Sequence, residues 1–188
     1  MSPPRPPDPR RLDVAAFARA DGRLQGEWPL AGMPRLLQDA LPLTPDSPAQ
    51  AVAWSAHGER RTAAGEAQTW LHLQARTALR LTCQRCLQPV TVELRVEPRL
   101  RFVRDEALAE QLDEDSEEDV LALSSALDLH ALVEDELILA LPLVPRHERC
   151  PQVLPMSAGT LDEPAADGVP GAFAGLAGLL KRVPDTPD

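Results

Sequence analysis

The chain has 188 residues, and its 19 Lys and Arg against 29 Asp and Glu give a net charge of −10, which argues against a protein that coats nucleic acid through overall positive charge. The length suits one ordinary domain with flexible ends, because the 20 prolines gather mainly toward the termini. No apolar run approaches the roughly 18 residues of a membrane span, and residues 1–11 lack the apolar core of a signal peptide, so we expect a cytoplasmic protein.

Composition divides the chain into a central domain and polar or proline-rich ends. We expect a disordered Pro/Arg tail at 1–11, a single domain at 12–150, a flexible linker at 151–170, and a short C-terminal helix with a tail at 171–188. In the last segment Phe173, Leu176 and Leu180 fall on one helical face. That face suits either packing against the core or binding a partner as a short motif, and both interpretations stay open.

The first half of the domain contains short helical and strand-like patterns. In chain order they predict a helix at 13–20, a strand at 24–30, a helical turn at 33–39, a loop at 41–50 and a strand at 51–56. A turn is expected next at His57-Gly58. A weaker run then reaches Ala64, and Gly65 supplies the following turn.

Two alternating runs flank a pair of cysteines and predict a hairpin. From Gln68 to Leu81 the apolar residues share odd positions, and from Val90 to Glu97 they share even positions. Pro98 interrupts the second run, and Leu100 and Phe102 resume it. Such a hairpin has CQRCLQ at its tip and, if the register allows, one exposed face carrying Arg80, Arg95, Arg99 and Arg101.

Charge changes sign along the second half of the domain. Seven arginines lie in residues 76–104 beside two glutamates, whereas residues 105–136 contain thirteen acidic residues and neither Lys nor Arg. The acidic stretch predicts a helical piece at 105–116, an acidic loop, and a strand at 119–123. The opposite charges either neutralise each other and are solvated, or they form a local basic face with an acidic flank that disfavours indiscriminate phosphate binding.

An amphipathic helix follows, with Asp128 as a suitable N-cap and Pro142 preventing its continuation. Its apolar positions gather on one arc, with Glu134 and Asp135 away from the centre, whereas Glu136 falls inside the arc. An unpaired carboxylate is costly to bury. Glu136 is therefore expected either to reach solvent or a surface arginine, or to pair with an arginine of the basic stretch.

Two pairs of potential metal ligands lie far apart in the chain. Cys83 and Cys86 have the spacing C-x-x-C at the hairpin tip, and His147 and Cys150 have the spacing H-x-x-C after the helix. Prolines hold the arm after the helix extended, so that it can return to the hairpin tip. Four such ligands satisfy a tetrahedral zinc ion and leave no open coordination position, which indicates one structural zinc. The alternatives are reduced thiols beside a surface histidine or, less favoured, a redox-active C-x-x-C.

Motifs typical of catalysis are missing from the sequence. There is no Gly-rich phosphate loop, no G-x-S-x-G and no H-E-x-x-H. His57, His72 and His130 have no neighbours at a catalytic spacing, so we expect them at the surface. With no Tyr, three Phe and three Trp, the chain offers few aromatic platforms for stacking on bases.

Three stretches taken together, CQRCLQPV, DVL and DLHALVEDELILALPLVPRHERCP, resemble the YceD family of large ribosomal RNA subunit accumulation proteins. The likeness runs in order over about residues 12–151 and includes L-x-G at Leu24–Gly26 and P-R-L at Pro34–Leu36. The closing AFAGLAGLLKR is similar to the family's last segment, although Gly171-Ala172 replaces the Asn-Pro expected there. The resemblance implies a cytoplasmic, non-enzymatic factor needed for the synthesis, processing or stability of 23S rRNA, and it supplies no catalytic residue.

The patterns predict an α+β fold: an antiparallel, meander-rich sheet that stays open or closes toward a small barrel, with the amphipathic helix packed on it. The resemblance makes ribosome biogenesis the leading function, with 23S rRNA or its precursor particle as partner. Because phosphate binding needs positive charge without base readout, the predicted RNA contacts are Arg85, Arg95, Arg99 and Arg101. The alternative is an adaptor that binds a ribosomal protein or an RNA-processing enzyme without touching RNA, through the acidic stretch or the Phe173, Leu176 and Leu180 face.

Overall fold

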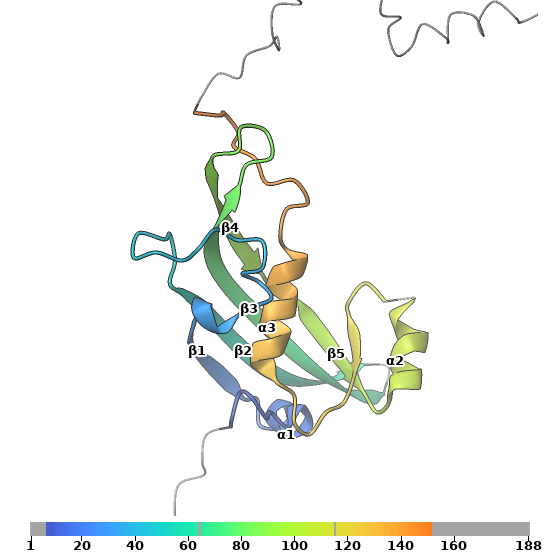
Figure 1. The fold of residues 1–188 in the computed structure, drawn as a ribbon. Helices are drawn as coiled ribbons and strands as arrows, with labels where there is room; N and C mark the ends of the chain where they lie inside the picture. The colour runs from blue at the N-terminus through green and yellow to red at the C-terminus, as the bar shows by residue number, and fades with distance from the viewer. Residues whose placement is uncertain (1–6, 64, 115, 152–188) are drawn as a thin grey trace, which may run out of the picture. The chain divides into compact units, whose positions relative to one another are not determined.

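The computed structural model describes residues 7–63, 65–114 and 116–151, which form a mixed α+β fold (Figure 1). The sheet has six strands, mostly antiparallel, in the order β1-β2-β3-β5-β6, with β4 also paired to β3. The elements are α1 (Val14–Arg19), β1 (Arg23–Pro29), the 3-10 turn η1 (Leu30–Gly32), β2 (Ala51–Ala63), β3 (Glu66–Thr82), β4 (Pro89–Val96), β5 (Arg99–Val103), α2 (Glu106–Asp113), β6 (Val120–Ala122) and α3 (Leu129–Leu139).

The predicted α+β class is confirmed, but the sheet is open. β1, β4 and β6 each have a free edge and none of them pairs with another, so the barrel alternative is wrong for the part of the chain that the structure describes. Most of the predicted linker and all of the predicted C-terminal segment, with Phe173, Leu176 and Leu180, lie outside the described residues.

β4 and β5 follow one another along the same edge of β3 and keep one register. Arg95 lies opposite Arg76, and Arg99 lies opposite His72, so no residue is inserted or lost between the two strands. Between β4 and β5, the N–H of Leu73 on β3 donates to the Pro98 carbonyl at 3.1 Å. The predicted hairpin and its interruption are therefore confirmed, and side chains of one parity stay on one face along both strands.

β2 runs straight through the turn expected at His57-Gly58, so that prediction is wrong. A Cβ atom on Gly58 would lie only 2.6 Å from Phe17 Cδ1 and 2.9 Å from the backbone nitrogen of Ala18, both in α1. This glycine therefore provides room for α1 to pack on the strand. The next turn falls at Gly65 as predicted, where φ is 83°.

Within the described residues, β6 is the one strand that pairs in parallel, alongside β5. α2 connects the two strands and returns the chain to its earlier direction, which a parallel pair requires. Asp105 caps this helix by accepting from the N–H of Leu108 at 2.9 Å. α2 packs on the outer face of the sheet, where Val103, Ala109 and Val120 are buried together.

α1 and α3 cover the opposite, inner face of the sheet, where the main core lies (Figure 1). The carboxylate of Asp128 accepts from the N–H groups of His130 and Ala131, so the predicted N-cap of α3 is confirmed. The helix ends at Leu139, with Ala140 as C-cap, shortly before Pro142. Its buried apolar residues face those of β3, and the fully buried side chains of the two elements are Leu71, Leu73, Leu79, Leu129, Val133 and Leu137.

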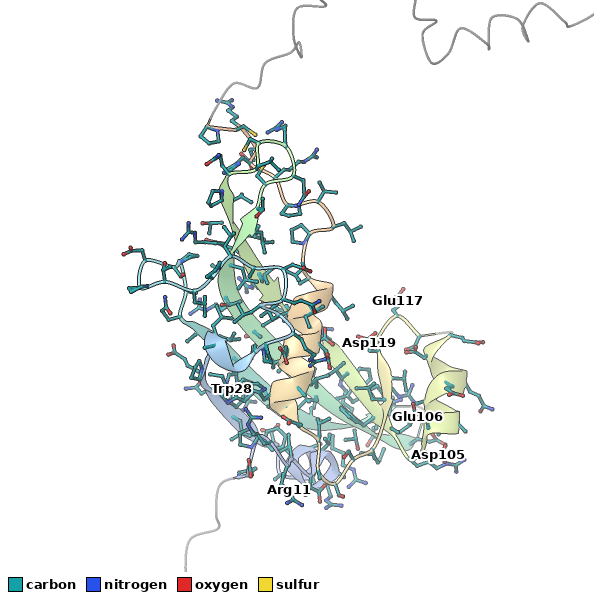
Figure 2. The ribbon with its side chains drawn as sticks, in the orientation of Figure 1. Arg11, Trp28, Asp105, Glu106, Glu117 and Asp119 are labelled. Atoms are coloured by element: carbon teal, nitrogen blue, oxygen red, sulfur yellow. The ribbon has the colours of Figure 1, made fainter. Side chains whose placement is uncertain are left out.

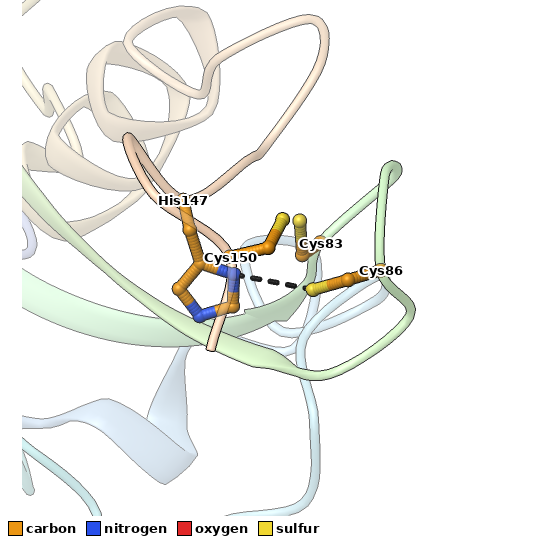
Figure 3. Close-up of side chains that lie close together, drawn as sticks. All are labelled: Cys83, Cys86, His147 and Cys150. Carbon is orange, nitrogen blue, oxygen red and sulfur yellow. Dashed lines mark hydrogen bonds between the residues drawn. The ribbon is translucent and has the colours of Figure 1, made fainter. Parts of the chain in front are cut away.

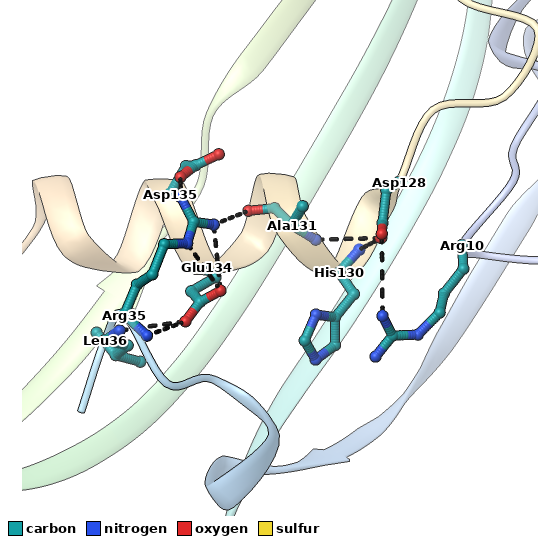
Figure 4. Close-up of polar contacts among 8 residues, drawn as sticks. All are labelled: Arg10, Arg35, Leu36, Asp128, His130, Ala131, Glu134 and Asp135. Atoms are coloured by element: carbon teal, nitrogen blue, oxygen red, sulfur yellow. Dashed lines mark hydrogen bonds and ion pairs between the residues drawn. The ribbon is translucent and has the colours of Figure 1, made fainter. Parts of the chain in front are cut away.

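The buried carboxylate of α3 is Glu134 rather than Glu136, so the predicted orientation of this helix face is wrong. Glu134 is 4% exposed and accepts from the backbone N–H groups of Arg35 at 2.8 Å and Leu36 at 3.2 Å (Figure 4). The Arg35 guanidinium also donates to it, with Nη2 at 3.1 Å. The segment after η1 packs on a side of α3 that periodicity alone places away from the core. Arg35 and Leu36 of this segment supply the hydrogen-bond donors that Glu134 needs when it is buried.

His130 is also buried, contrary to the surface position expected for it. It is 6% exposed, and its ring meets the Trp28 ring edge-on at 4.8 Å between centroids. Burial lowers the pKa of His130. This histidine belongs to the packing between α3 and β1.

Candidate functional site

The turn between β3 and β4 carries Cys83 and Cys86. The N–H of Leu87 donates to the Cys83 carbonyl at 2.9 Å, and the N–H of Cys83 donates to the Gln88 carbonyl at 2.9 Å. Leu87 closes the turn with φ at 59°, in the left-handed region. Figure 3 shows the result, with both sulfurs directed toward the same side of the loop.

The arm after α3 runs back to this hairpin tip (Figures 1 and 3). The N–H of Gln84 donates to the Pro145 carbonyl at 2.8 Å, which joins the arm to the turn. The structure thereby brings all four predicted ligands together: one ligand atom each from Cys83, Cys86, His147 and Cys150 lies within 4.8 Å of the others. This Cys3His cluster could hold a metal ion such as zinc.

The imidazole of His147 is oriented for metal binding. Its Nε2 lies 3.0 Å from the Pro89 carbonyl oxygen, and a carbonyl only accepts, so Nε2 carries the proton. The lone pair is then on Nδ1, which lies 3.4 Å from Cys86 Sγ. A histidine ligand held by a carbonyl at its other nitrogen is the usual second-layer arrangement of protein zinc sites.

The sulfurs are surrounded by hydrogen-bond donors, which favours thiolates. Although burial raises the pKa of Cys83, backbone N–H groups of Cys86, His147 and Arg85 donate to its sulfur and lower this pKa to about 5. The Arg85 Nε donates to Cys150 Sγ at 3.0 Å. Burial raises the pKa of Cys86. Thiolate is the form that binds zinc.

Arg85 lies at the cluster and not on a strand. Besides Cys150, its Nη2 donates to the carbonyls of His147 at 2.7 Å and Glu148 at 3.2 Å. The Nε and Nη2 groups of Arg85 therefore donate to three acceptors of the arm. Its Nη1 group has no hydrogen-bond partner among the described residues. The sequence placed Arg85 with the phosphate contacts and gave no signal for this bridging position.

The other predicted arginines lie on the outer face of the sheet. Because directly paired residues point to the same side, the registers of β3, β4 and β5 place Arg80, Arg95, Arg99 and Arg101 together, as the parity predicted. A fifth member, Arg76, lies directly opposite Arg95. We call Arg76, Arg80, Arg95, Arg99 and Arg101 the arginine face. The alternation of β3 places Arg76 on the outer face, but its pairing with Arg95 depends on the register and could not be predicted from the sequence.

Rows of paired residues cross the outer face at right angles to the strands. One row is Arg23, His57, His72 and Arg99; the next is Gln25, Ser55 and Gln74; the third is Glu27, Ala53, Arg76 and Arg95. The small residues Ala53 and Ser55 lie between longer side chains, and a hollow of about 530 Å³ opens above them. Sequence analysis missed this groove, since it depends on the alignment of β1, β2, β3 and β4.

Acidic residues occupy the opposite end of the sheet. Figure 2 shows Asp105, Glu106, Glu117 and Asp119 around α2 and the start of β6. The hairpin tip and the Cys3His cluster lie at the other end of the long β3 strand (Figures 1 and 2). The arginines reach this acidic end as well, because Arg101 lies opposite Val120 and its N–H donates to the Asp119 carbonyl at 2.9 Å.

Together these features define a class: an α+β protein in which one hairpin carries a Cys3His cluster at its tip and arginines along its outer face. A sequence model of the YceD family, described as "Large ribosomal RNA subunit accumulation protein YceD", matches residues 71–180, which is more than half of the chain. The chain belongs to the YceD family. Membership links it to the accumulation of the large ribosomal RNA subunit.

A curated relative supports this assignment. The chain is 39% identical over 105 residues to the Haemophilus influenzae protein named "Large ribosomal RNA subunit accumulation protein YceD", a match that covers 54% of this chain and 60% of the relative. The chain thus spans less than two thirds of that relative's length. The comparison with solved structures found no match. Among the described residues, none of the helices combines the length and apolar character needed to span a bilayer.

Proposed function

We propose that this protein is a non-enzymatic, cytoplasmic ribosome-biogenesis factor that contacts 23S rRNA or its precursor particle through the arginine face. The observation that supports the proposal most is the alignment of five arginines on the outer face of the sheet, which α2 covers only beside β5 and β6. Phosphate oxygens are bound by such groups without any demand on base sequence. Family membership supplies the link to the large ribosomal RNA.

The charges on this face are largely free to bind a polyanion. Arg95 donates to Glu97 at 2.7 Å through Nε, whereas Arg76, Arg99 and Arg101 have no carboxylate within ion-pair distance among the described residues. Arg76 and Arg95 also face each other directly, and like charges in paired positions repel. A phosphate placed between them would relieve that repulsion. The acidic residues around α2 would disfavour RNA beyond β5.

For the Cys3His cluster we propose one structural zinc ion. Three thiols and an imidazole match a closed tetrahedral site, which leaves no position for a substrate. The ion would fix the arm after α3 to the tip of the hairpin. Arg85 would complete the site by holding Cys150, and its free Nη1 could still contact phosphate at the edge of the arginine face. The free thiols, with no disulfide among the described residues, suit a reducing compartment.

The RNA contact can be tested by reversing charge on this face. The double variant Arg99→Glu and Arg101→Glu should bind 23S rRNA at least about tenfold more weakly at low salt and show a shallower dependence of affinity on salt. A matched control is Arg19→Glu with Arg60→Glu, two exposed arginines off the outer face. Unchanged binding of the first variant at low salt would remove the arginine face from consideration.

A second candidate function is the adaptor, which binds a ribosomal protein or processing enzyme without RNA. The observation that favours it is a run of exposed apolar side chains at and after the end of α3, with Leu139, Leu143 and Val144 at 79%, 100% and 57% exposure. RNase treatment of a pull-down separates the two functions. Partners that remain bound after the RNA is digested favour the adaptor.

A further inference from the structure

We propose that the groove on the outer face is a base-reading pocket for an unpaired nucleotide of RNA. This inference rests on the proposed function and extends it from phosphate binding to sequence preference. The groove lies beside the arginine face, so a strand held there by its phosphates would pass directly over it. Its volume of about 530 Å³ is sufficient for one nucleotide.

The chemistry of the groove suits a nucleobase better than a phosphate alone. Gln25, Ser55 and Gln74 form one cross-strand row along it, and their side chains have no hydrogen-bond partner among the described residues. An amide both donates and accepts, and a hydroxyl does the same, so this row can match the edge of a base. Uncharged polar side chains of this kind read base edges in unpaired RNA.

Charges around the groove are balanced, which adds selectivity. Arg76 and Arg95 line it together with Glu27 and Glu97. The two carboxylates disfavour filling the groove with a bare anion. Glu97 accepts from Arg95, whereas Glu27 has no such partner among the described residues and can accept from an exocyclic amino group of a base. Arg76 and Arg95 can meanwhile bind the phosphate that follows the base. The groove therefore has separate places for a base and for its backbone.

An aromatic pair borders the neighbouring row. The rings of His57 and His72 stack with centroids 5.6 Å apart, and the Nε2 of each ring donates to a carboxylate: Asp21 at 2.7 Å and Glu59 at 2.6 Å. Both rings are partly exposed, at 26% and 27% of the side chain. A histidine ring can stack on an unpaired base, so this pair offers a surface for the adjacent nucleotide.

The position of the groove argues against an extended peptide as its ligand. Peptides that recognise a sheet usually add a strand to a free edge through main-chain hydrogen bonds. The groove instead lies on the face of strands β1, β2 and β3, of which β2 and β3 are already paired on both sides. Recognition there must use side chains, as base readout does.

The test uses the full chain and fluorescence anisotropy with 5′-labelled single-stranded decamers of A, C or U. The wild type should bind its best decamer at least about tenfold more tightly than its worst, since hydrogen bonds to a base edge discriminate between bases by about that factor or more. Replacing Gln25 and Gln74 by Leu should reduce this ratio to less than about threefold and leave the salt dependence unchanged. Ser55→Leu, which fills the hollow, should act likewise.

Gln111→Leu is the matched control, because Gln111 is exposed on α2 and lies outside the groove. Equal binding of all three decamers by the wild type, or an unchanged ratio in the Gln25 and Gln74 double variant, would overturn the base-reading pocket while leaving the arginine face intact. Equal competition by a duplex of the same length would overturn it too. Failure of every decamer to bind at low salt would instead overturn the proposed RNA contact itself, and the pocket with it.

Discussion

Two carboxylates of α3 lie in opposite surroundings although they are two residues apart. Glu134 is enclosed and accepts from two backbone N–H groups and one guanidinium. Glu136 is half-buried, and its side chain has no hydrogen-bond donor among the described residues. The first carboxylate should stabilise the fold, and the second should destabilise it when ionised.

Glu134→Ala should lower the free energy of unfolding by about 2 to 3 kcal/mol, because several charge-assisted hydrogen bonds are lost and two buried N–H groups lose their acceptor. Urea denaturation measures this change. The neighbouring pair between Arg35 and Asp135 is half-exposed on both sides, so Asp135→Ala should cost less than about 1 kcal/mol. Equal losses in the two variants would contradict this account of α3.

Glu136 should make stability depend on pH in a predictable direction. Burial raises its pKa above 4.5, and the nearby Asp119 and Asp135 carboxylates raise it further. The stability that the protonated group provides is fully present below pH 4.5 and is lost as the pH rises through the folded-state pKa. Glu136→Gln should therefore be more stable than the wild type at pH 7 and equally stable at pH 4. A variant that is less stable at pH 7 would disprove this reading.

At the scale of elements, the arm after α3 and the β3–β4 hairpin are joined by hydrogen bonds of Gln84 and Arg85 and by the Cys3His cluster, which we propose binds zinc. One metal ion per chain should therefore be found by elemental analysis of protein purified without chelators. Removing it should leave the sheet folded: Cys83, Cys86 and Cys150 are part of the core cluster, but the rest of that cluster consists of apolar side chains that bind no metal. Local order at the hairpin tip and the arm should decrease.

Amide exchange at 83–88 and 143–150 should then rise at least about tenfold, equivalent to about 1.4 kcal/mol of local stability. His147→Ala should reproduce the effect, whereas His57→Ala, a histidine outside the cluster, should retain the metal. Protein that contains no zinc and exchanges equally with and without chelator would rule out the structural zinc ion.

The same elements show how far sequence reasoning reaches. Strand parity and caps predicted β3, β4, β5 and α3, because each depends on neighbours within a few residues of the chain. The turn predicted at Gly58 was wrong because this glycine makes room for α1, which is distant in sequence. The position predicted for Glu134, away from the apolar side of α3, was wrong because the segment after η1 packs on it. The four cysteine and histidine ligands could be predicted from spacing, whereas Arg76 and the Gln25, Ser55 and Gln74 row required the register of three strand pairs.

For the molecule as a whole, net charge is a poor guide to its partner. The chain carries −10 overall, yet the arginine face begins beside the acidic residues around α2 and extends from β5 along β3 and β4 toward the hairpin tip. Such an arrangement suits a factor that binds RNA in one orientation and releases it readily, since the acidic end repels further backbone. Affinity should therefore be moderate and strongly dependent on salt.

The account depends above all on direct contact between the arginine face and the large ribosomal RNA. Ultraviolet crosslinking in cells, with mass spectrometry of the attached peptides, measures that contact. We expect crosslinked peptides from residues 66–103 attached to 23S rRNA or its precursor, and few from the acidic residues 105–119. Crosslinks absent from 66–103, or found only on other RNAs, would contradict the account.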